Sequence, residues 1–305
     1  MPDLPIFKDL CVEMRNEYDK YYRLSQTYIT DLTFNCRYAW DNVFCDKYAI
    51  IEDCLVIISN GGCFTHPHML MPLGNLDDDK LARIIDQVVP IFEGRGWALR
   101  IMGIDEDKID LFDRLGYEKI SFCFSNNNSD YLYDAEALRT LSTNELRKKR
   151  THFNRFLRLY PNYEYQSITQ NDMSDCLRLV ETWSTEKGID VTDVKKSDYL
   201  MIKRLFKHFG DLDVRGGVIR IDGKVAAFSM GSFGNHDTAY IHFEKADVSY
   251  DGAYPAINKL VIENAYPEAK FVNREEDLGM PGLRKSKRSY YPLRMIKKYG
   301  CQIVI

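Results

Sequence analysis

The chain has 305 residues, of which 45% are hydrophobic and 28% are charged. This composition is that of a soluble globular protein, and it excludes a disordered or fibrous chain. No apolar run approaches the ~18 residues of a membrane span, and the N-terminus shows no signal peptide, so the sequence predicts a cytoplasmic protein.

The formal net charge of −4 conceals a difference between the two halves of the chain. Residues 1–145 carry 14 Lys and Arg against 25 Asp and Glu, whereas residues 146–305 carry 27 against 20. A basic region attracts anionic molecules over distances longer than a direct contact. We therefore expect an anionic partner to bind the second half.

Cysteine and histidine usage gives little support to a metal site. The eight cysteines form no C-x-x-C pair, and four of them recur every nine residues from Cys36 to Cys63, which matches no pattern of metal ligands. His66 and His68 could share one face of a strand, but His-Pro-His is more typical of a turn. The sequence predicts no metal, and the cysteines are expected to be small buried hydrophobes.

The first half predicts a mixed α/β domain. Glu52-Asp53 separates two apolar runs as a hairpin turn would, and Asp77 to Asp79 can cap an amphipathic helix. The expected elements in chain order are a polar helix at 8–24, strands at 48–51, 54–59 and 63–73, a helix that ends at Gly94 or Gly96, a strand at 97–102, a polar helix ending near 116, and a strand around 119–124.

A basic helix is predicted to follow the first domain. Ser142 to Glu145 has the pattern of a capping box, and it precedes a helix with apolar residues on one face. The opposite face is cationic and includes Arg147, Lys148 and Arg150. This face is either the solvated side of a helix that bridges two domains or a platform for a phosphate backbone.

The order of elements in the first half then returns. Two helices precede a hairpin whose turn is Asp222-Gly223, the strongest short hairpin signal in the chain. A strand at 238–244 leads to Asp251-Gly252, which caps another helix. An internal duplication explains this repetition. We expect an N-terminal domain at 1–135, a connecting basic helix at 136–161 and a C-terminal domain at 162–305.

The stretch from 272 to 299 places a carboxylate cluster beside a cationic one. Arg274, Glu275, Glu276 and Asp277 follow a short apolar run, and a turn rich in Gly and Pro leads to a second group. That group comprises Arg284, Lys285, Lys287, Arg288, Tyr290 and Tyr291. Cations interleaved with aromatic rings suit a single-stranded nucleotide end or a nucleotide cofactor, whereas a solvated surface helix is the alternative interpretation.

The segment from Ala239 to Leu260 resembles the acetyltransferase (GNAT) fold. A strand there runs into a loop and then into the start of a helix, where members of that fold bind a pyrophosphate. The R/Q-x-x-G-x-G/A loop that such enzymes use for coenzyme A is missing, and Gly252 is the glycine that remains.

Two further motifs resemble the phosphatidylglycerol lysyltransferase C-terminal family. Tyr133-Asp134-Ala135 leads to the basic helix from Leu146, and Asn273 to Gly279 leads to Leu283 to Lys287 with Tyr290. The resemblance spans nearly the whole chain. It implies two tandem GNAT-like domains that transfer an aminoacyl group from its tRNA ester to an acceptor.

Aminoacyl transfer needs groups that hold the adenosine end of tRNA and a group that removes a proton from the acceptor. The residues expected to bind the donor are Arg274, Arg284, Lys285, Lys287, Arg288 and Tyr290, with Arg147, Lys148 and Arg150. Glu244, Glu275 and Asp277 are the expected catalytic carboxylates, because sheet carboxylates at strand ends can face a cleft. One of them is a general base or an anchor for a cationic aminoacyl group.

Two other functions fit the same fold. The chain could be an N-acyltransferase that uses an acyl-coenzyme A, with the helix start at Gly252 taking the pyrophosphate. It could also be a binding module for an anionic ligand, because the sequence contains no unambiguous nucleophile. The expected partner is therefore the acceptor end of tRNA or a small molecule that contains a nucleotide, and the expected donor is aminoacyl-tRNA or acyl-CoA.

Overall fold

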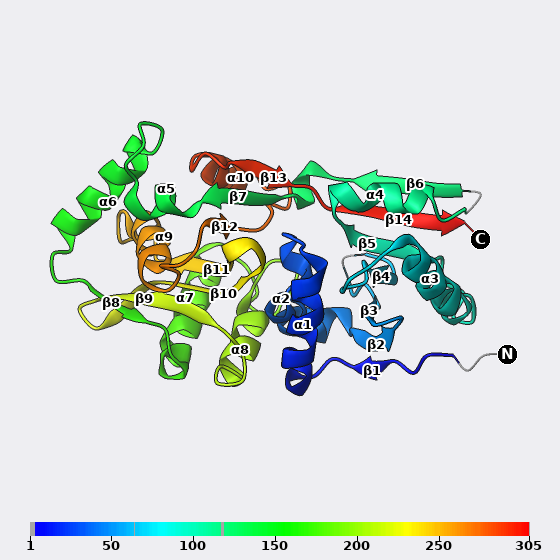
Figure 1. Cartoon of the computed structure of the whole chain (residues 1–305). Coiled ribbons are helices and arrows are strands. Elements are labelled where there is room, and N and C mark those ends of the chain that lie inside the picture. The colour runs from blue at the N-terminus through cyan, green and yellow to red at the C-terminus, as the bar shows by residue number, and fades with distance from the viewer. Residues whose placement is uncertain (1–3, 64, 117–118, 305) are drawn as a thin grey trace. The chain divides into compact units, whose positions relative to one another are not determined.

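The computed structural model of the chain describes residues 4–63, 65–116 and 119–304 (Figure 1). The chain divides into two compact units, Met1–Ser129 with Ile296–Ile305 and Asp130–Met295. Each unit contains one seven-stranded sheet with both parallel and antiparallel pairs. The predicted mixed α/β fold is thereby confirmed.

The first unit is built on the strand order β1-β2-β3-β4-β5-β14-β6. Its strands are β1 (Lys8–Asp9), β2 (Lys47–Ile51), β3 (Cys54–Ser59), β4 (His68–Leu70), β5 (Arg100–Ile104), β6 (Lys119–Phe124) and β14 (Tyr299–Val304). Its α-helices are α1 (Arg15–Ser25), α2 (Phe34–Phe44), α3 (Asp78–Glu93) and α4 (Ile109–Asp113). Helix α2, which begins at the N-cap Thr33, was not among the elements expected from the sequence.

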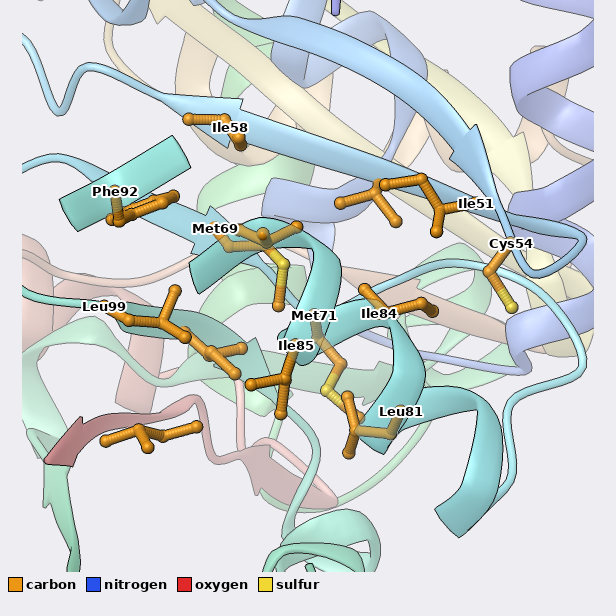
Figure 2. Packing of buried hydrophobic residues seen from close by; sticks show 14 of the residues in the cluster. Ile51, Cys54, Ile58, Met69, Met71, Leu81, Ile84, Ile85, Phe92 and Leu99 are labelled. Atoms are coloured by element: carbon orange, nitrogen blue, oxygen red, sulfur yellow. The ribbon is translucent and has the colours of Figure 1, made fainter. Parts of the chain in front are cut away.

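Helix α3 supplies one side of the core of the first unit. Its apolar stripe recurs every three to four residues, so Leu81, Ile84 and Ile85 all face the sheet. Figure 2 shows these side chains against Ile51 of β2 and Met69 of β4. The Asp77 side chain caps the helix by accepting from the backbone N–H of Lys80, as the sequence predicted.

The second unit is built on the strand order β13-β7-β12-β11-β10-β9-β8. Its strands are β7 (Asp130–Asp134), β8 (Glu164–Ser167), β9 (Arg215–Ile221), β10 (Lys224–Gly234), β11 (Thr238–Ala246), β12 (Phe271–Asn273) and β13 (Arg294–Ile296). Its α-helices are α5 (Ala135–Thr140), α6 (Arg147–Leu159), α7 (Met173–Glu186), α8 (Tyr199–Lys207), α9 (Ala253–Asn264) and α10 (Pro281–Arg288).

Helices α7 and α9 cover opposite faces of the second sheet. Successive side chains of a strand point to opposite faces. On β11, Glu244 accepts a hydrogen bond from Asn258 of α9, whereas the next residue, Lys245, lies over the ring of Trp183 of α7. The strand between them is therefore enclosed on both sides.

Both predicted hairpin turns are present. Glu52 and Asp53 have φ of 54° and 56°, and Asp222 and Gly223 have φ of 49° and 74°. Two consecutive residues with positive φ match the twist of the flanking strands, which is why Asp and Gly are favoured in such turns.

The two units repeat one arrangement. In the first, an antiparallel hairpin leads through β4, α3 and β5, and β4 pairs with β5 in parallel. In the second, the hairpin of β9 and β10 leads through β11, α9 and β12, and β11 pairs with β12 in parallel. This agreement supports the duplication inferred from the sequence.

The units divide the chain differently from the ranges expected from the sequence. Strand β14 lies between β5 and β6 in the first sheet, although its residues belong to the expected range 162–305. Strand β7 pairs with β12 in the second sheet, although it lies within the expected range 1–135. Each sheet is completed by a strand from a distant part of the sequence, and local patterns do not reveal such pairing.

The predicted capping box at residues 142–145 is not formed. Helix α6 begins at Arg147, and the hydroxyl of Ser142 is hydrogen-bonded to that of Thr140 at 3.0 Å. Leu146, the N-cap residue, is buried in the core beside α5 instead. The N–H of Leu146 donates to the hydroxyl of Thr143 at 3.4 Å, so the polar contact at this helix start comes from Thr143 and not from Ser142.

Candidate functional site

The site lies where β11 and β12 diverge in the second unit. Their pairing extends from Thr238 to Tyr240 on β11 and ends at Asn273 on β12, whereas β11 continues to Ala246. Polar and charged side chains gather beyond this point: His242 and Glu244 from β11, and Arg274 and Glu275 from the segment after β12. Ligands in α/β folds commonly bind beyond the carboxyl ends of parallel strands.

Glu244 and Arg274 form a buried ion pair. One Glu244 carboxylate oxygen lies 2.9 Å from Nη2 of Arg274, and their side chains are 11% and 9% exposed. The other oxygen accepts from the amide of Asn258 on α9 at 3.1 Å. Burial is the largest effect and opposes the charge of Arg274, but Glu244, Tyr133 and Tyr290 together offset it, so the pKa of the guanidinium is raised. Arg274 therefore stays charged and fixed in position.

Arg274 is also part of a stack of rings and cations. Its guanidinium lies 4.6 Å from the ring centre of Tyr290 and 5.7 Å from that of Tyr133. The ammonium of Lys149 lies 3.9 Å from the centre of the Tyr290 ring. Burial, together with the charge of Arg274, lowers the pKa of Lys149 to about 8. The first turn of α6 thus contacts the segment just after α10.

Ser232, His242 and Glu275 form a second polar chain. The hydroxyl of Ser232 lies 2.9 Å from Nε2 of His242, and Nδ1 of His242 lies 2.9 Å from Oε1 of Glu275. Burial lowers the pKa of His242 to about 4. The imidazole is therefore neutral at neutral pH, and it connects the interior of the sheet to the Glu275 carboxylate.

The Asp277 carboxylate is hydrogen-bonded to Arg284 of α10 and to Tyr131 of β7. The Arg284 guanidinium donates to both of its carboxylate oxygens at 2.8 Å, and the Tyr131 hydroxyl donates at 2.6 Å. These bonds, the one from Arg284 first, hold the pKa of Asp277 well below its usual range. Asp277 thus connects α10 to β7.

Lys287 points inward from α10. Its ammonium donates to the backbone carbonyl of Arg274 at 2.5 Å and to that of Glu276, and the residue is 7% exposed. Burial lowers its pKa to about 8. The predicted donor-binding residue Lys287 therefore fixes the loop that presents Arg274 and Glu275.

The remaining predicted cations are mostly exposed, and Arg288 also interacts with the Tyr131 hydroxyl. Arg147 and Lys148 on α6 and Lys285 and Arg288 on α10 are exposed. Arg150 donates to the carbonyl of Leu141 at 2.6 Å. Lys149, which follows Arg147 and Lys148 on α6, contacts Tyr290, which follows Arg288 of α10. We call these four exposed residues the basic surface.

Gly252 lies at the start of α9, beneath α6. Its φ is +87°, and a Cβ there would lie 2.7 Å from the carbonyl oxygen of His152 and 2.9 Å from Cβ of Phe156. Arg155 of α6 forms an ion pair with Asp251 at 2.8 Å. Helix α6 thus packs directly on the helix start at which the sequence suggested a pyrophosphate site.

The sequence reading missed Ser232, His242, Asn258 and the role of Lys149. His242 is a polar residue within the apolar strand β11, and this was the signal that could have revealed it. It was not recognised because its partners come from β10 and from the segment after β12. Within the described residues, no group of three His, Cys, Asp or Glu could hold a metal ion, and no helix has the length and apolarity to cross a membrane.

The fold defines the class of protein: two tandem GNAT-like domains, each with a parallel strand-helix-strand crossover. Residues 22–302 match the family described as phosphatidylglycerol lysyltransferase, C-terminal, and the chain belongs to this family. The resemblance noted in the sequence is thereby confirmed.

Two solved structures illustrate the similarity. A conserved protein of unknown function from Bacteroides thetaiotaomicron is 29% identical, with a TM-score of 0.92 over 99% of this chain and 100% of that one. L-PGS from Bacillus licheniformis is 15% identical, with a TM-score of 0.63 over 88% of this chain and 86% of that one. The second likeness shows the fold alone.

A curated relative matches a smaller part of the chain. It is an uncharacterised protein of Mycoplasmoides gallisepticum, 21% identical over 179 residues, which are 58% of this chain. The match spans 57% of that relative's length.

Proposed function

We propose that this protein transfers an aminoacyl group from aminoacyl-tRNA to an amine or hydroxyl acceptor. Membership of the lysyltransferase family supports aminoacyl transfer as the class of reaction. The observation that carries the proposal is the position of Glu275, a partly exposed carboxylate at the diverging strands, in the same unit as the basic surface.

The basic surface suits the acceptor end of tRNA. Arg147, Lys148, Lys285 and Arg288 present four exposed cations, which bind phosphates through charge and counterion release. Tyr291, which is 58% exposed, adds an aromatic face on which an unpaired base can stack. Stacking and charge together hold a single-stranded nucleotide end without reading its sequence.

Glu275 is the best placed of the three predicted catalytic carboxylates. The ester of aminoacyl-tRNA is already activated, so the protein's task is to orient the reactants and remove a proton from the acceptor. The side chain of Glu275 is 26% exposed, compared with 11% for Glu244 and 1% for Asp277. Glu275 can therefore reach an acceptor, whereas the other two are held by Arg274 and Arg284.

Glu244 suits the second role considered for it, the anchoring of a cationic aminoacyl group. Ser229 lies opposite Glu244 in the strand register, and Asn258 is bonded to it. Both are fully buried, and the Ser229 hydroxyl and the Asn258 carbonyl oxygen have no hydrogen-bond partner in the part of the chain that the structure describes. Buried acceptors beside a carboxylate favour an ammonium donor as their partner.

An acyl-coenzyme A donor has less support from the geometry. Its pyrophosphate would bind at the start of α9, where backbone N–H groups point outward. Helix α6 packs on this position through the His152 carbonyl and Phe156. We therefore favour tRNA as the donor.

The test is a transfer assay with the purified protein and radiolabelled aminoacyl-tRNAs. The acceptors are small amines, hydroxyl compounds and vesicles that contain phosphatidylglycerol, and acetyl-CoA replaces tRNA in a parallel series. We expect label to move from tRNA to one acceptor class and Glu275→Gln to slow transfer by about 10²- to 10⁴-fold, the usual contribution of a general base. Transfer from acetyl-CoA but not from tRNA would contradict the proposal and indicate an acyl-CoA-dependent acyltransferase. Binding without any transfer would indicate a binding module.

A further inference from the structure

The second sheet holds Glu275 in place through two residues that no local sequence pattern connects with it. Ser232 comes from β10, His242 from β11, and Glu275 follows β12. Hydrogen bonds of 2.9 Å join Ser232 to Nε2 of His242 and Nδ1 of His242 to Glu275. Exposure increases along this chain, from Ser232 and His242, each 8% exposed, to the Glu275 side chain at 26%.

The backbone is shaped to form this chain. The pairing of β10 with β11 shifts between Met230 and Gly231, whose partners are Phe243 and Ile241, so His242 is the additional residue of a β-bulge. Bulges redirect side chains and occur often beside active sites. Glu275 has a φ of +58°, a region that residues other than glycine rarely adopt. Backbone strain of this kind is found where the surrounding structure imposes one orientation.

The donors and acceptors around His242 determine its tautomer. A neutral imidazole carries one N–H donor and one acceptor nitrogen. The ionised Glu275 carboxylate only accepts, so Nδ1 must carry the proton, and Nε2 must then accept from the hydroxyl of Ser232. If the hydroxyl were removed, Nε2 would be buried without a donor, and Glu275 alone would hold the ring in this tautomer.

We propose that Ser232 and His242 are positioning residues, which orient Glu275 as the base of the transfer reaction: His242 donates to Glu275 from Nδ1, and Ser232 holds the ring by donating to Nε2. The kinetic part of this inference rests on the proposed function, whereas the tautomer does not. Glu275 is the base in this arrangement, and His242 and Ser232 hold it in position, as a third group does in other catalytic sites.

The groups near Glu275 that can carry a charge include His242 and Lys287. His242 faces it from β11, and burial keeps that imidazole neutral, with a pKa of about 4. The Lys287 ammonium of α10 interacts with Glu275, and Glu276, Arg274 and Asp130 also act on this lysine. Lys287 is itself held in place by its hydrogen bonds to the carbonyls of Arg274 and Glu276.

Nitrogen-15 NMR of the histidine side chains tests the tautomer directly in the full chain. The chain has six histidines, and the signal of His242 is the one that disappears in His242→Gln. We expect a neutral ring with its proton on Nδ1 throughout pH 6 to 8. A ring protonated on Nε2 alone, or a doubly protonated ring at pH 7, would overturn the proposal even if the wild-type protein transferred aminoacyl groups.

Ser232→Ala and Ser232→Thr form a matched pair for the kinetic test. We expect the alanine variant to keep the Nδ1–H tautomer but to shift the Nε2 signal, which loses its hydrogen bond, to lower kcat about tenfold or more, and to move the acidic limb of the pH–rate profile to higher pH. The threonine variant keeps a hydroxyl and should behave as the wild type. Equal pH profiles in all three proteins would reduce Ser232 to a structural role, and lack of transfer by the wild type would count against the proposed function while the NMR result still decided the tautomer.

Discussion

Glu244 and Arg274 are mutually dependent, because each is the charged partner that makes burial of the other tolerable. They lie 2.9 Å apart with side chains 11% and 9% exposed. Removing one partner of a buried ion pair leaves an uncompensated charge, which costs about 3–5 kcal/mol. The pair therefore couples the position of β11 to that of the segment after β12.

We expect Glu244→Gln and Arg274→Met each to lower the free energy of unfolding by about 3–5 kcal/mol. The double variant should lose less than the sum of the two, because it buries no unpaired charge. Urea denaturation of the four proteins measures this coupling. Additive losses would show that the two side chains do not depend on each other.

The contact between α6 and the start of α9 predicts the effect of adding one methyl group. Gly252→Ala places a Cβ 2.7 Å from the His152 carbonyl oxygen, at a residue with φ of +87°. Gly188→Ala is the matched control, since Gly188 has φ of +63° with nothing within 4 Å of its added Cβ. The control should lose about 1 kcal/mol from backbone strain alone. If Gly252→Ala loses more thermal stability than Gly188→Ala, the difference measures the packing of α6 on α9. Equal losses in the two variants would show that α6 can move to accommodate the methyl group without loss of stability.

Lys149 predicts a dependence of stability on pH. Its pKa is lowered from the ordinary lysine value to about 8, so between pH 8 and 10.5 the unfolded chain binds more protons than the folded one. The penalty for burying the charge is fully present below pH 8, and it falls as the pH rises toward 10.5. We expect Lys149→Met to be more stable than the wild type at pH 7, with a difference that shrinks toward pH 10.5. Chemical denaturation at several pH values measures it, and a difference independent of pH would contradict the shift.

The sequence predicted the local features of the second unit better than its long-range ones. The turn Asp222-Gly223 and the stripe of α9 depend on neighbouring residues, and both occur as expected. The acidic and basic clusters of residues 274–288 were recognised, but sequence gave no means of deciding which charges face inward. Arg284 and Lys287 are engaged with Asp277 and with backbone carbonyls, whereas Lys285 and Arg288 remain exposed.

The missed residues share a physical reason. His242 lies at a bulge, so simple alternation along β11 does not say where its side chain points. Its partners, Ser232 and Glu275, are separated from it by 10 and 33 positions. Constellations of this kind depend on strand pairing and register, which no local pattern contains.

The basic surface predicts how tRNA binding depends on salt. Each phosphate contact contributes about 0.7–0.9 to the slope of log affinity against log salt, so losing two contacts should reduce that slope by about 1.5. We expect Arg147→Glu with Lys148→Glu to weaken binding and to flatten the salt dependence, and Lys285→Glu with Arg288→Glu to do the same. Lys195→Glu with Lys224→Glu is the control, because it makes an equal change of charge at exposed positions elsewhere in the second unit. Fluorescence anisotropy with labelled tRNA at several salt concentrations gives the slopes. Equal weakening by all three pairs would indicate that net charge alone attracts tRNA, because a defined surface loses affinity only when its own cations are reversed.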